Sequence, residues 1–166
     1  MILSDRDLRK AQANHGIVEP WRDEHVQPAS IDLRLGRDFL FMGASINAAG
    51  NMPLEPGDFA LGTTMETVTI PAHLVGQING RSSWARKGLI VHTTAGFIDP
   101  GFTGQVTLEL KNVGHETLWL PVGERICQLV LTQLTSPAER PYGSEGLGSH
   151  YQGQQGVTPS AIGEAA

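Results

Sequence analysis

One six-residue segment of the chain holds side chains that can bind a phosphate group. It reads Arg81, Ser82, Ser83, Trp84, Ala85 and Arg86. If residues 83–87 form a helical turn, Ser82 and Arg86 lie four positions apart on one face and can contact the same ligand. Serines and free backbone N–H groups at a helix start attract phosphate oxygens, and the arginines add charge-assisted hydrogen bonds. A capped surface turn with solvated arginines explains the same residues, so both interpretations stay open for this segment alone.

A lone acidic residue, Glu109, interrupts an apolar segment further along the chain. Alternation over residues 105–111 places Val106, Leu108 and Leu110 on one face and Thr107, Glu109 and Lys111 on the other. Taken by itself, Glu109 is explained by a solvated strand position. Beside two serines and two arginines, however, its carboxylate has a ligand to act on. A general base contributes about 10²–10⁴-fold to a rate. Glu109 is therefore our candidate for the base that activates a water for attack on an activated ring carbon.

A glycine-rich bend between these two segments supplies further candidates. Asp99 precedes a Pro-Gly pair, a composition that directs its side chain outward at a sheet edge, and an ordinary turn aspartate is the alternative. Ala95 and Gly96 are small, so a ligand can approach the backbone there. We interpret His92 as a packed or hydrogen-bonded strand residue rather than a catalytic base.

Composition limits the class of protein. The 166 residues are 40% hydrophobic and 17% charged, which predicts one globular domain over residues 1–166. A net charge of -5 argues against binding to a nucleic acid polymer, although a few arginines can hold a small polyphosphate. One cysteine and the lack of an apolar leader or span favour a cytoplasmic protein without a membrane segment. We expect this residue, Cys127, to be a buried, inert thiol.

The cysteine count also bears on metal chemistry. Zinc deaminases of the cytidine type hold their metal with His/Cys/Cys or three Cys in an H-x-E and P-C-x-x-C pattern. This chain has a single cysteine and six scattered histidines. We therefore expect no zinc and no preformed set of metal ligands.

The elements that must position these residues are predicted to be mostly short strands. A serine and acids at residues 4–7, followed by Leu8, Ala11 and a stop at His15-Gly16, predict one short N-terminal helix. Strands are expected over residues 31–35 and 39–42, and between recurrent turn signals at 59–61, 68–70, 75–78, 89–92, 106–110, 117–120 and 126–131. Such spacing indicates a sandwich, barrel or jelly roll.

The tryptophans and the tail complete the structural expectations. We place Trp119 in the core and Trp21 in a surface loop. After Tyr142, glycine and polar residues dominate and apolar periodicity ends. We expect a flexible tail over about residues 143–166, either mobile or ordered by a ligand.

Together these motifs resemble the trimeric dCTP deaminase and dUTPase superfamily, and within it the dCTP deaminase branch. Residues 81–86 resemble its R/K-S-S-L-x-R motif, residues 94–102 its T-A-G/H-x-I-D-P-G-F/W motif, and residues 107–109 its catalytic strand. Residues 27–35, Gln128, residues 136–142 and residues 151–154 add to the likeness. The resemblance implies a distorted jelly-roll β-barrel, a homotrimer with active sites between subunits, and a C-terminal tail that closes each site over the nucleotide.

The resemblance also implies roles for residues. Glu109 would act as general base and then acid during attack of water on cytosine C4, while Ser82, Arg86 and the Ala95 carbonyl orient the water. Phosphate contacts would come from Arg81, Ser82, Ser83, Gln128, Tyr142 and Gln154, the deoxyribose contact from Asp99, and base contacts from Thr107 and Leu108. Trp84 and Ala85 complete the binding segment. His150 stands where a lysine or arginine is expected on the triphosphate, which makes tail affinity weaker or pH-dependent.

The implied reaction is hydrolysis of the cyclic amidine C–N bond of dCTP to give dUTP and ammonia, in the synthesis of dTTP precursors. Mg²⁺ would arrive on the triphosphate, and dTTP would be an inhibitor. Gly96 and Phe97 resemble a branch that continues to dUMP and pyrophosphate, whereas strictly monofunctional enzymes carry His-Arg there. A monofunctional deaminase, a dUTPase without deaminase activity and a non-catalytic nucleotide-binding regulator stay open as alternatives.

Overall fold

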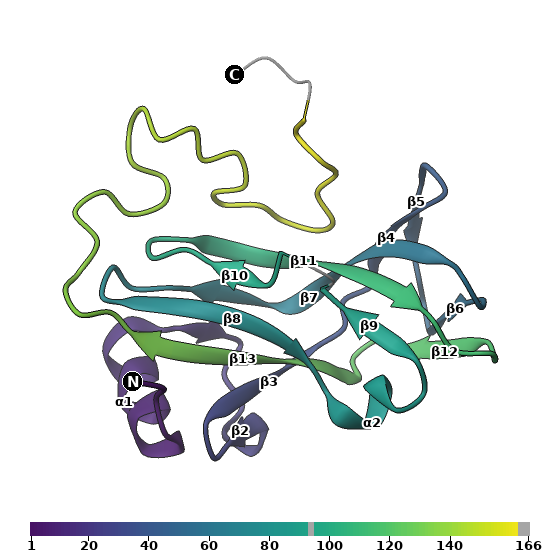
Figure 1. Ribbon diagram of the computed structural model, residues 1–166, viewed down its shortest axis with the longest axis horizontal. Helices are drawn as coiled ribbons and strands as arrows, with labels where there is room; N and C mark the ends of the chain where they lie inside the picture. Colours follow the sequence, from purple (N-terminus) through teal and green to yellow (C-terminus); the bar gives the residue numbers. More distant parts are fainter. Residues whose placement is uncertain (93–94, 163–166) are drawn as a thin grey trace.

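Strands form most of the structure, a computed structural model that describes residues 1–92 and 95–162 (Figure 1). In this part of the chain the helical elements are α1 (Asp5–His15), the 3-10 helix η1 (Asp23–His25) and α2 (Ser82–Ala85). None of these helices has the length and apolar character needed to cross a membrane.

Two antiparallel sheets enclose the apolar core. One runs in the order β5 (Ala44–Asn47), β4 (Asp38–Phe41), β7 (Phe59–Thr69), β11 (Thr103–Asn112) and β9 (Leu89–Val91), with β1 (Val18–Glu19) also pairing with β7. The other runs in the order β10 (Phe97–Ile98), β8 (Leu74–Gly80), β13 (Arg125–Gln133), β3 (Ser30–Arg34) and β2 (Val26–Gln27). A small ribbon pairs β12 (Leu118–Pro121) with β6 (Asn51–Leu54). Figure 1 shows β8 and β13 lying beneath β7 and β11.

The N-terminal helix agrees with its sequence signals. Helix α1 follows Ser4 and buries Leu8 and Ala11 against the core. It ends where Gly16 adopts a left-handed conformation, with φ of 59°. The Ser4 hydroxyl donates to the carboxylate of Asp7 at 3.2 Å instead of capping a backbone N–H group.

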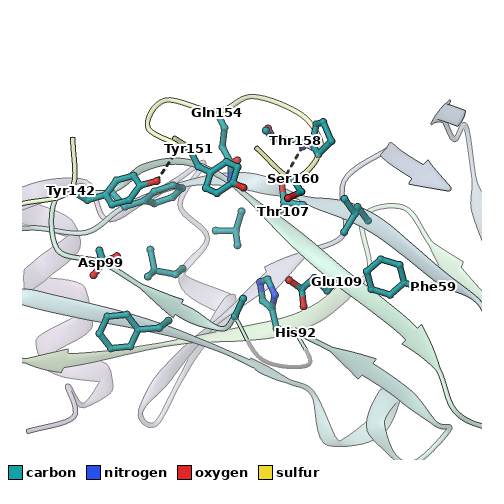
Figure 2. Close-up of a pocket in the computed structure, with 17 residues that line it drawn as sticks. Phe59, His92, Asp99, Thr107, Glu109, Tyr142, Tyr151, Gln154, Thr158 and Ser160 are labelled. Atoms are coloured by element: carbon teal, nitrogen blue, oxygen red, sulfur yellow. Dashed lines mark hydrogen bonds between the residues drawn. The ribbon is translucent and has the colours of Figure 1, made fainter. Parts of the chain in front are cut away.

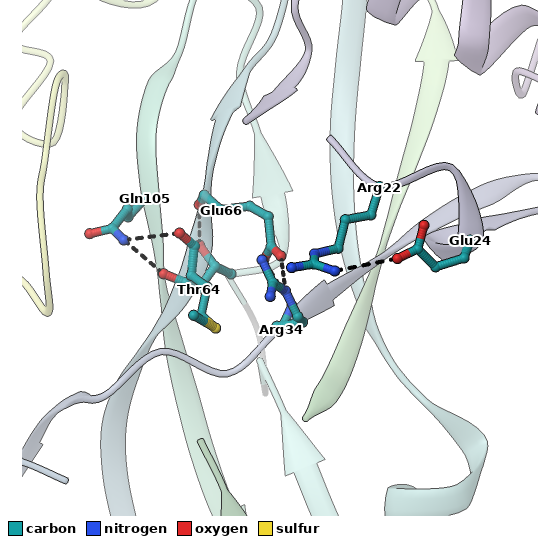
Figure 3. A network of polar contacts seen from close by, with 7 residues as sticks. Arg22, Glu24, Arg34, Thr64, Glu66 and Gln105 are labelled. Carbon is teal, nitrogen blue, oxygen red and sulfur yellow. Dashed lines mark hydrogen bonds and ion pairs between the residues drawn. The ribbon is translucent and has the colours of Figure 1, made fainter. Parts of the chain in front are cut away.

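Two predicted strands, residues 59–61 and 68–70, are joined in the single long strand β7. The sequence suggested a break because polar residues separate the two apolar runs. Three of these polar residues, Thr63, Thr64 and Glu66, are buried. The two threonine hydroxyls donate to carbonyls of β7 itself, and the Thr64 hydroxyl also accepts from Val106 N–H of β11 at 2.9 Å, whereas Glu66 is bound from another strand (Figure 3). The Arg34 Nε donates to Glu66 Oε1 at 2.6 Å and the Arg34 backbone N–H to Glu66 Oε2 at 2.8 Å, so this pair ties β3 in one sheet to β7 in the other.

The prediction for Trp119 was wrong, whereas that for Cys127 is confirmed. Alternation along β12 turns Leu118 and Leu120 inward and leaves the Trp119 residue 59% exposed. Trp21 lies in a loop but packs partly against the core. Cys127 is fully buried, and burial raises the pKa of its thiol far above the ordinary value, which makes it unreactive.

After β13 the chain returns across the molecule and runs along β11 (Figure 1). Gly153 N–H donates to the Thr103 carbonyl at 2.8 Å, and Gln105 N–H donates to the Gln154 carbonyl at 3.0 Å. Further along, Thr158 N–H donates to the Thr107 hydroxyl at 3.2 Å. The described part of the tail is therefore seated on the outward face of the strand that carries Glu109.

Candidate functional site

A pocket of about 550 Å³ lies between β11, the bend around β10 and the returning tail (Figure 2). Seven residues predicted for the site line it: Ala95, Phe97, Asp99, Thr107, Glu109, Tyr142 and Gln154. They come from three separate parts of the sequence. The strand supplies Thr107 and Glu109, the bend supplies Ala95, Phe97 and Asp99, and the tail supplies Tyr142 and Gln154.

The side chain of Glu109 faces the interior of this pocket because of its position in β11. Burial along the strand alternates, so Leu108 and Leu110 fill the core while Thr107 and Glu109 point to the opposite face. Leu108, which was predicted to contact the base, is completely buried and does not line the pocket. The carboxylate of Glu109 thus lies where it can accept a proton from a water in the pocket.

His92 is a pocket residue that the sequence interpretation assigned to a strand. Strand β9 ends at Val91, and His92 follows it with a φ of 56°, a left-handed conformation that is uncommon for residues other than glycine. Its backbone N–H donates to the Glu109 carbonyl at 3.0 Å, and its ring lies beside the Glu109 side chain in Figure 2. His92 is therefore packed and hydrogen-bonded through its backbone, as expected, but it lies just after β9 rather than within a strand.

The environment favours the neutral form of the His92 ring. Burial lowers its pKa, and the negative charge of Glu109 opposes that shift without cancelling it. Its buried Nδ1 has no hydrogen-bond partner among the described residues. No sequence signal marked His92, because its importance comes from the left-handed turn that aims it at Glu109.

Aromatic rings form much of the remaining wall, and most of them were missed. Phe59, Phe97, Phe102 and Tyr151 line the pocket together with Tyr142. The exposed fraction is 66% for Phe97 and 49% for Phe59, so the pocket has an apolar rim open to solvent. Only Phe97 and Tyr142 were named in advance for a site role, because aromatic residues spread over the chain carry no local motif.

The tail is held over the pocket by its own hydroxyl groups. Tyr151 N–H donates to the Tyr142 hydroxyl at 2.9 Å, and Ala161 N–H donates to the Tyr151 hydroxyl at 3.1 Å. This closure brings Thr158 and Ser160 to the pocket wall (Figure 2). His150 is exposed and does not line the pocket.

Gly96 and Phe97, which together predicted the branch that forms dUMP, have different surroundings. Phe97 lines the pocket, whereas Gly96 belongs to the packing of β10 against β8. A Cβ atom on Gly96 would lie 2.8 Å from the Ile78 carbonyl oxygen, and the Gly96 carbonyl accepts a 2.7 Å hydrogen bond from Ile78 N–H. Close packing of the backbone therefore explains the glycine.

The phosphate-binding segment does not reach this pocket. Ser82 and Ser83 are exposed on α2, whose bounds begin one residue before the predicted turn. Trp84, Ala85 and Arg86 border a separate hollow of about 700 Å³ that also includes Trp119. The Lys87 ammonium lies 5.2 Å from the centre of the Trp84 ring, a cation–π distance.

Arg81 and Gln128, the other predicted phosphate ligands, meet on a buried carboxylate. The Arg81 Nε lies 3.4 Å from Asp32 Oδ2, and the Gln128 Nε2 donates to Asp32 Oδ1 at 3.3 Å. The structure therefore divides the predicted site into the pocket around Glu109 and a polar surface at the start of α2.

No group of three or more His, Cys, Asp or Glu side chains in the described ranges is arranged to hold a metal ion. The pocket supplies a carboxylate, a neutral imidazole and hydroxyl groups. Such a set can bind an uncharged ring and move protons at it.

Comparison with known proteins shows which family this chain resembles. A family described as dCTP deaminase-like matches residues 2–49 and 44–134. The dCTP deaminase, dUMP-forming, of Bifidobacterium animalis subsp. lactis is 49% identical to this chain, with 96% of this chain and 93% of that protein covered.

Two solved structures share the fold. The 2'-deoxycytidine 5'-triphosphate deaminase of Agrobacterium tumefaciens aligns with a TM-score of 0.69 at 22% identity, covering 80% of this chain and 48% of that one. A dUTPase of Staphylococcus aureus phage phi11, in which a structural Mg(II) ion is coordinated, aligns with a TM-score of 0.53 at 23% identity, covering 72% and 85%. These likenesses confirm the predicted jelly-roll fold of the dUTPase type.

Proposed function

Because this chain belongs to the dCTP deaminase-like family, we propose that it hydrolyses dCTP to dUTP and ammonia. The observation that carries the proposal is the position of Glu109, a carboxylate on a rigid strand inside a pocket with aromatic walls. Thr107 on the same face is placed to meet a pyrimidine edge, and Asp99 lies on the adjacent wall for the deoxyribose. The pocket is of the size and character expected for a small ligand.

The reaction requires one group that takes and returns protons. Glu109 accepts a proton from water as the oxygen attacks C4 of cytosine and delivers it to N3; it then takes the proton of the new C4 hydroxyl and delivers it to the departing amine. The C4–N bond then breaks, ammonia leaves and the 4-oxo ring of uracil forms. The Ala95 carbonyl borders the pocket and orients the water together with Ser82 and Arg86.

Ser82 and Arg86 complete the site from a neighbouring protomer. Within one chain they lie outside the pocket, while the pocket rim exposes Phe59 and Phe97. A cyclic homotrimer brings the α2 segment of one copy to the pocket of the next and covers the exposed rings. The division of the residues within a single chain supports this arrangement.

The product is proposed to be dUMP with pyrophosphate, formed after deamination. Support comes from the relative that is 49% identical and named dUMP-forming, and from Phe97 at the pocket rim. Release of dUTP without further hydrolysis is the alternative. We also propose that dTTP, which shares the triphosphate and deoxyribose, binds at the same site as an inhibitor.

Magnesium is proposed as part of the substrate. Mg²⁺ prefers phosphate oxygens and water, and it is commonly bound through a nucleotide rather than by a cage of protein ligands. The cationic side chain of Arg81, the backbone N–H of Ser83 and the neutral amide of Gln128 are then the protein contacts of the triphosphate, and the tail over residues 143–162 closes on it. A soluble, cytoplasmic setting follows from this substrate.

The test is a product assay with dCTP and Mg²⁺ that resolves ammonia, dUTP, dUMP and pyrophosphate over time. We expect ammonia, dUMP and pyrophosphate in equal amounts. Accumulation of dUTP indicates the monofunctional reaction, and pyrophosphate from dUTP without ammonia from dCTP indicates a dUTPase. Tight binding of dCTP or dTTP without any product indicates a nucleotide-binding regulator.

A further inference from the structure

An irregularity in β13 sets the direction of two polar side chains. In the pairing with β3, Arg125 lies opposite Arg34 and Cys127 lies opposite Leu33, so Ile126 is an extra residue, a β-bulge. Ile126 and Cys127 are both buried, whereas regular alternation would turn one of them outward. The bulge therefore brings Arg125 to the same outer face as Gln128, although the two are three positions apart.

Both side chains converge on Asp32, the residue opposite Gln128 in β3. Asp32 Oδ2 accepts from Arg125 Nη1 at 3.2 Å and lies 3.4 Å from Arg81 Nε, and Oδ1 accepts from Gln128 Nε2 at 3.3 Å. Gln128 Nε2 also donates to the Ser30 hydroxyl at 3.1 Å. One carboxylate, 1% exposed, thus holds two side chains from β13 and the side chain of Arg81, which lies between β8 and α2.

The charges of this cluster do not balance around the buried carboxylate. Arg81 and Arg125 share the single negative charge of Asp32, and the side chains of the two arginines keep exposed fractions of 23% and 39%. Glu124 approaches Arg81 Nη1 at 3.7 Å, but its side chain is 42% exposed, so water screens that contact. The outer ends of the two guanidinium groups are left to bind an anion.

We propose that Asp32 positions a polyphosphate-binding subsite and that Arg125 is a phosphate ligand in it. Two planar guanidinium groups held on one carboxylate present several N–H donors at fixed spacing, which suits the oxygens of adjacent phosphate groups. Gln128 adds a neutral donor beside them. The bulge at Ile126 is the backbone device that makes Arg125 part of the set.

The subsite rests on the proposed function for its nucleotide, because Arg81 and Gln128 are there assigned to the triphosphate of dCTP. Binding of inorganic tripolyphosphate is independent of deamination and can be measured by calorimetry. We expect Arg125→Gln to weaken that binding and to raise the KM for dCTP by about tenfold, the loss of one charge-assisted hydrogen bond, with little change in kcat. The affinity of Arg125→Lys for tripolyphosphate should lie between those of the wild type and Arg125→Gln, since lysine keeps the charge but cannot bridge Asp32 and a phosphate.

Asp32→Asn separates positioning from simple electrostatics. If charge alone mattered, loss of a negative charge beside an anion site would tighten the binding of tripolyphosphate. Glu124→Gln, which removes such a charge without removing an anchor, is expected to tighten it by about twofold. Asp32→Asn is expected to weaken tripolyphosphate binding instead, because the guanidinium groups lose their common anchor. Arg37→Gln is the control for Arg125→Gln, because it also removes one positive charge but at an exposed arginine away from the cluster. It should leave the dissociation constant of tripolyphosphate unchanged.

The outcomes are distinguishable from failure of the proposed reaction. If the Arg125→Gln variant binds tripolyphosphate with the affinity of the wild type, Arg125 is not a phosphate ligand. If the Asp32→Asn variant binds it more tightly than the wild type, Asp32 does not position the subsite. If tripolyphosphate does not bind the intact protein, the subsite is refuted. If tripolyphosphate binds and these variants lose it while dCTP yields no ammonia, the subsite stands and the deaminase proposal falls.

Discussion

The pocket around Glu109 and the polar face around Asp32 differ in almost every physical property. The pocket is walled by aromatic rings and holds an acid and a neutral imidazole, whereas the Asp32 face holds arginines fixed on the outside of the other sheet. A pyrimidine ring suits the first environment and a polyphosphate suits the second. In our proposal the chain therefore carries two half-sites, one for the chemistry and one that binds the phosphates of the substrate.

This contrast explains why the two regions sit on different supports. Proton transfer needs a side chain fixed to within a fraction of an ångström, and β11, paired on both sides by β7 and β9, provides such a support. Binding of phosphate depends on charge, which tolerates a surface position. The predictions below separate the two regions, beginning with the largest expected effect.

Glu109→Gln should abolish most deamination, by about 10²–10⁴-fold in kcat, because the amide keeps the volume but cannot accept a proton. Affinity for dCTP should stay within about tenfold of wild type, since the phosphate contacts belong to the other region. Single-turnover kinetics with calorimetry checks both numbers. Turnover of dCTP by this variant at a rate near that of the wild type would show that Glu109 is not the general base.

Glu66→Gln should lower the free energy of unfolding by about 3–5 kcal/mol, because it leaves Arg34 buried without its counter-charge. This pair joins β3, which carries Asp32, to β7, which supports β11. Both regions should therefore fail together on denaturation. Urea unfolding provides the measurement.

Asp23→Asn is the matched control for that change, because Asp23 forms an exposed ion pair with Arg9. Its unfolding midpoint should equal that of wild type. An equal loss from both variants would show that burial of the Glu66 pair is unimportant.

Gly104→Ala should disturb the seat of the tail on β11. The added Cβ would lie 3.1 Å from both the backbone N and O of Gln154, closer than ordinary contact, so the tail must shift. We expect a rise of several-fold in the KM for dCTP and faster hydrogen exchange over the tail. Gly50→Ala, which meets nothing within 4 Å, is the control and should match wild type in both measurements.

His92→Gln should reduce the sensitivity of stability to acid, the smallest of these effects. Burial lowers the pKa of His92 below its unfolded value near 6.5, so the unfolded chain binds more protons as pH falls through that value. Stability from this group is present above about pH 6.5 and is lost below it. His25, whose pKa is also lowered by burial, contributes in the same direction in both proteins.

Unfolding midpoints at pH 7.5 and pH 5.5 check this prediction by difference. The variant should lose less stability than wild type between the two pH values. A parallel decline in both proteins would show that His92 titrates in the folded state as it does in the unfolded chain.

Sequence reasoning succeeded where the signal was local. Alternation around Glu109 predicted the face that it occupies, and the apolar stripe of Leu8 and Ala11 predicted α1. It failed where tertiary contacts decide the outcome. The polar residues around Glu66 predicted a break within β7, because the partner of Glu66, Arg34, lies 32 residues away in the sequence.

For the candidate site, side-chain types were predictable and spatial grouping was not. The spacing of Ser82 and Arg86 predicted a shared face, but no local pattern indicates that α2 lies apart from the pocket of its own chain. The prediction for Trp119 failed because a large aromatic side chain favours burial, whereas alternation with the buried Leu118 and Leu120 turns this residue outward. His92 and Arg125 owe their directions to a left-handed turn and a bulge, and neither feature has a side-chain signature.

The central claim is that the Glu109 pocket of one protomer is completed by α2 of another. Glu109→Gln and Arg86→Gln proteins, each expected to be inactive, can be dissociated, mixed in equal amounts and reassociated. In a cyclic trimer every mixed assembly regains one intact site, so activity should return to about a quarter of that of wild-type protein treated in the same way. A mixture as inactive as its two parents, beside full recovery of the wild type, would contradict the account.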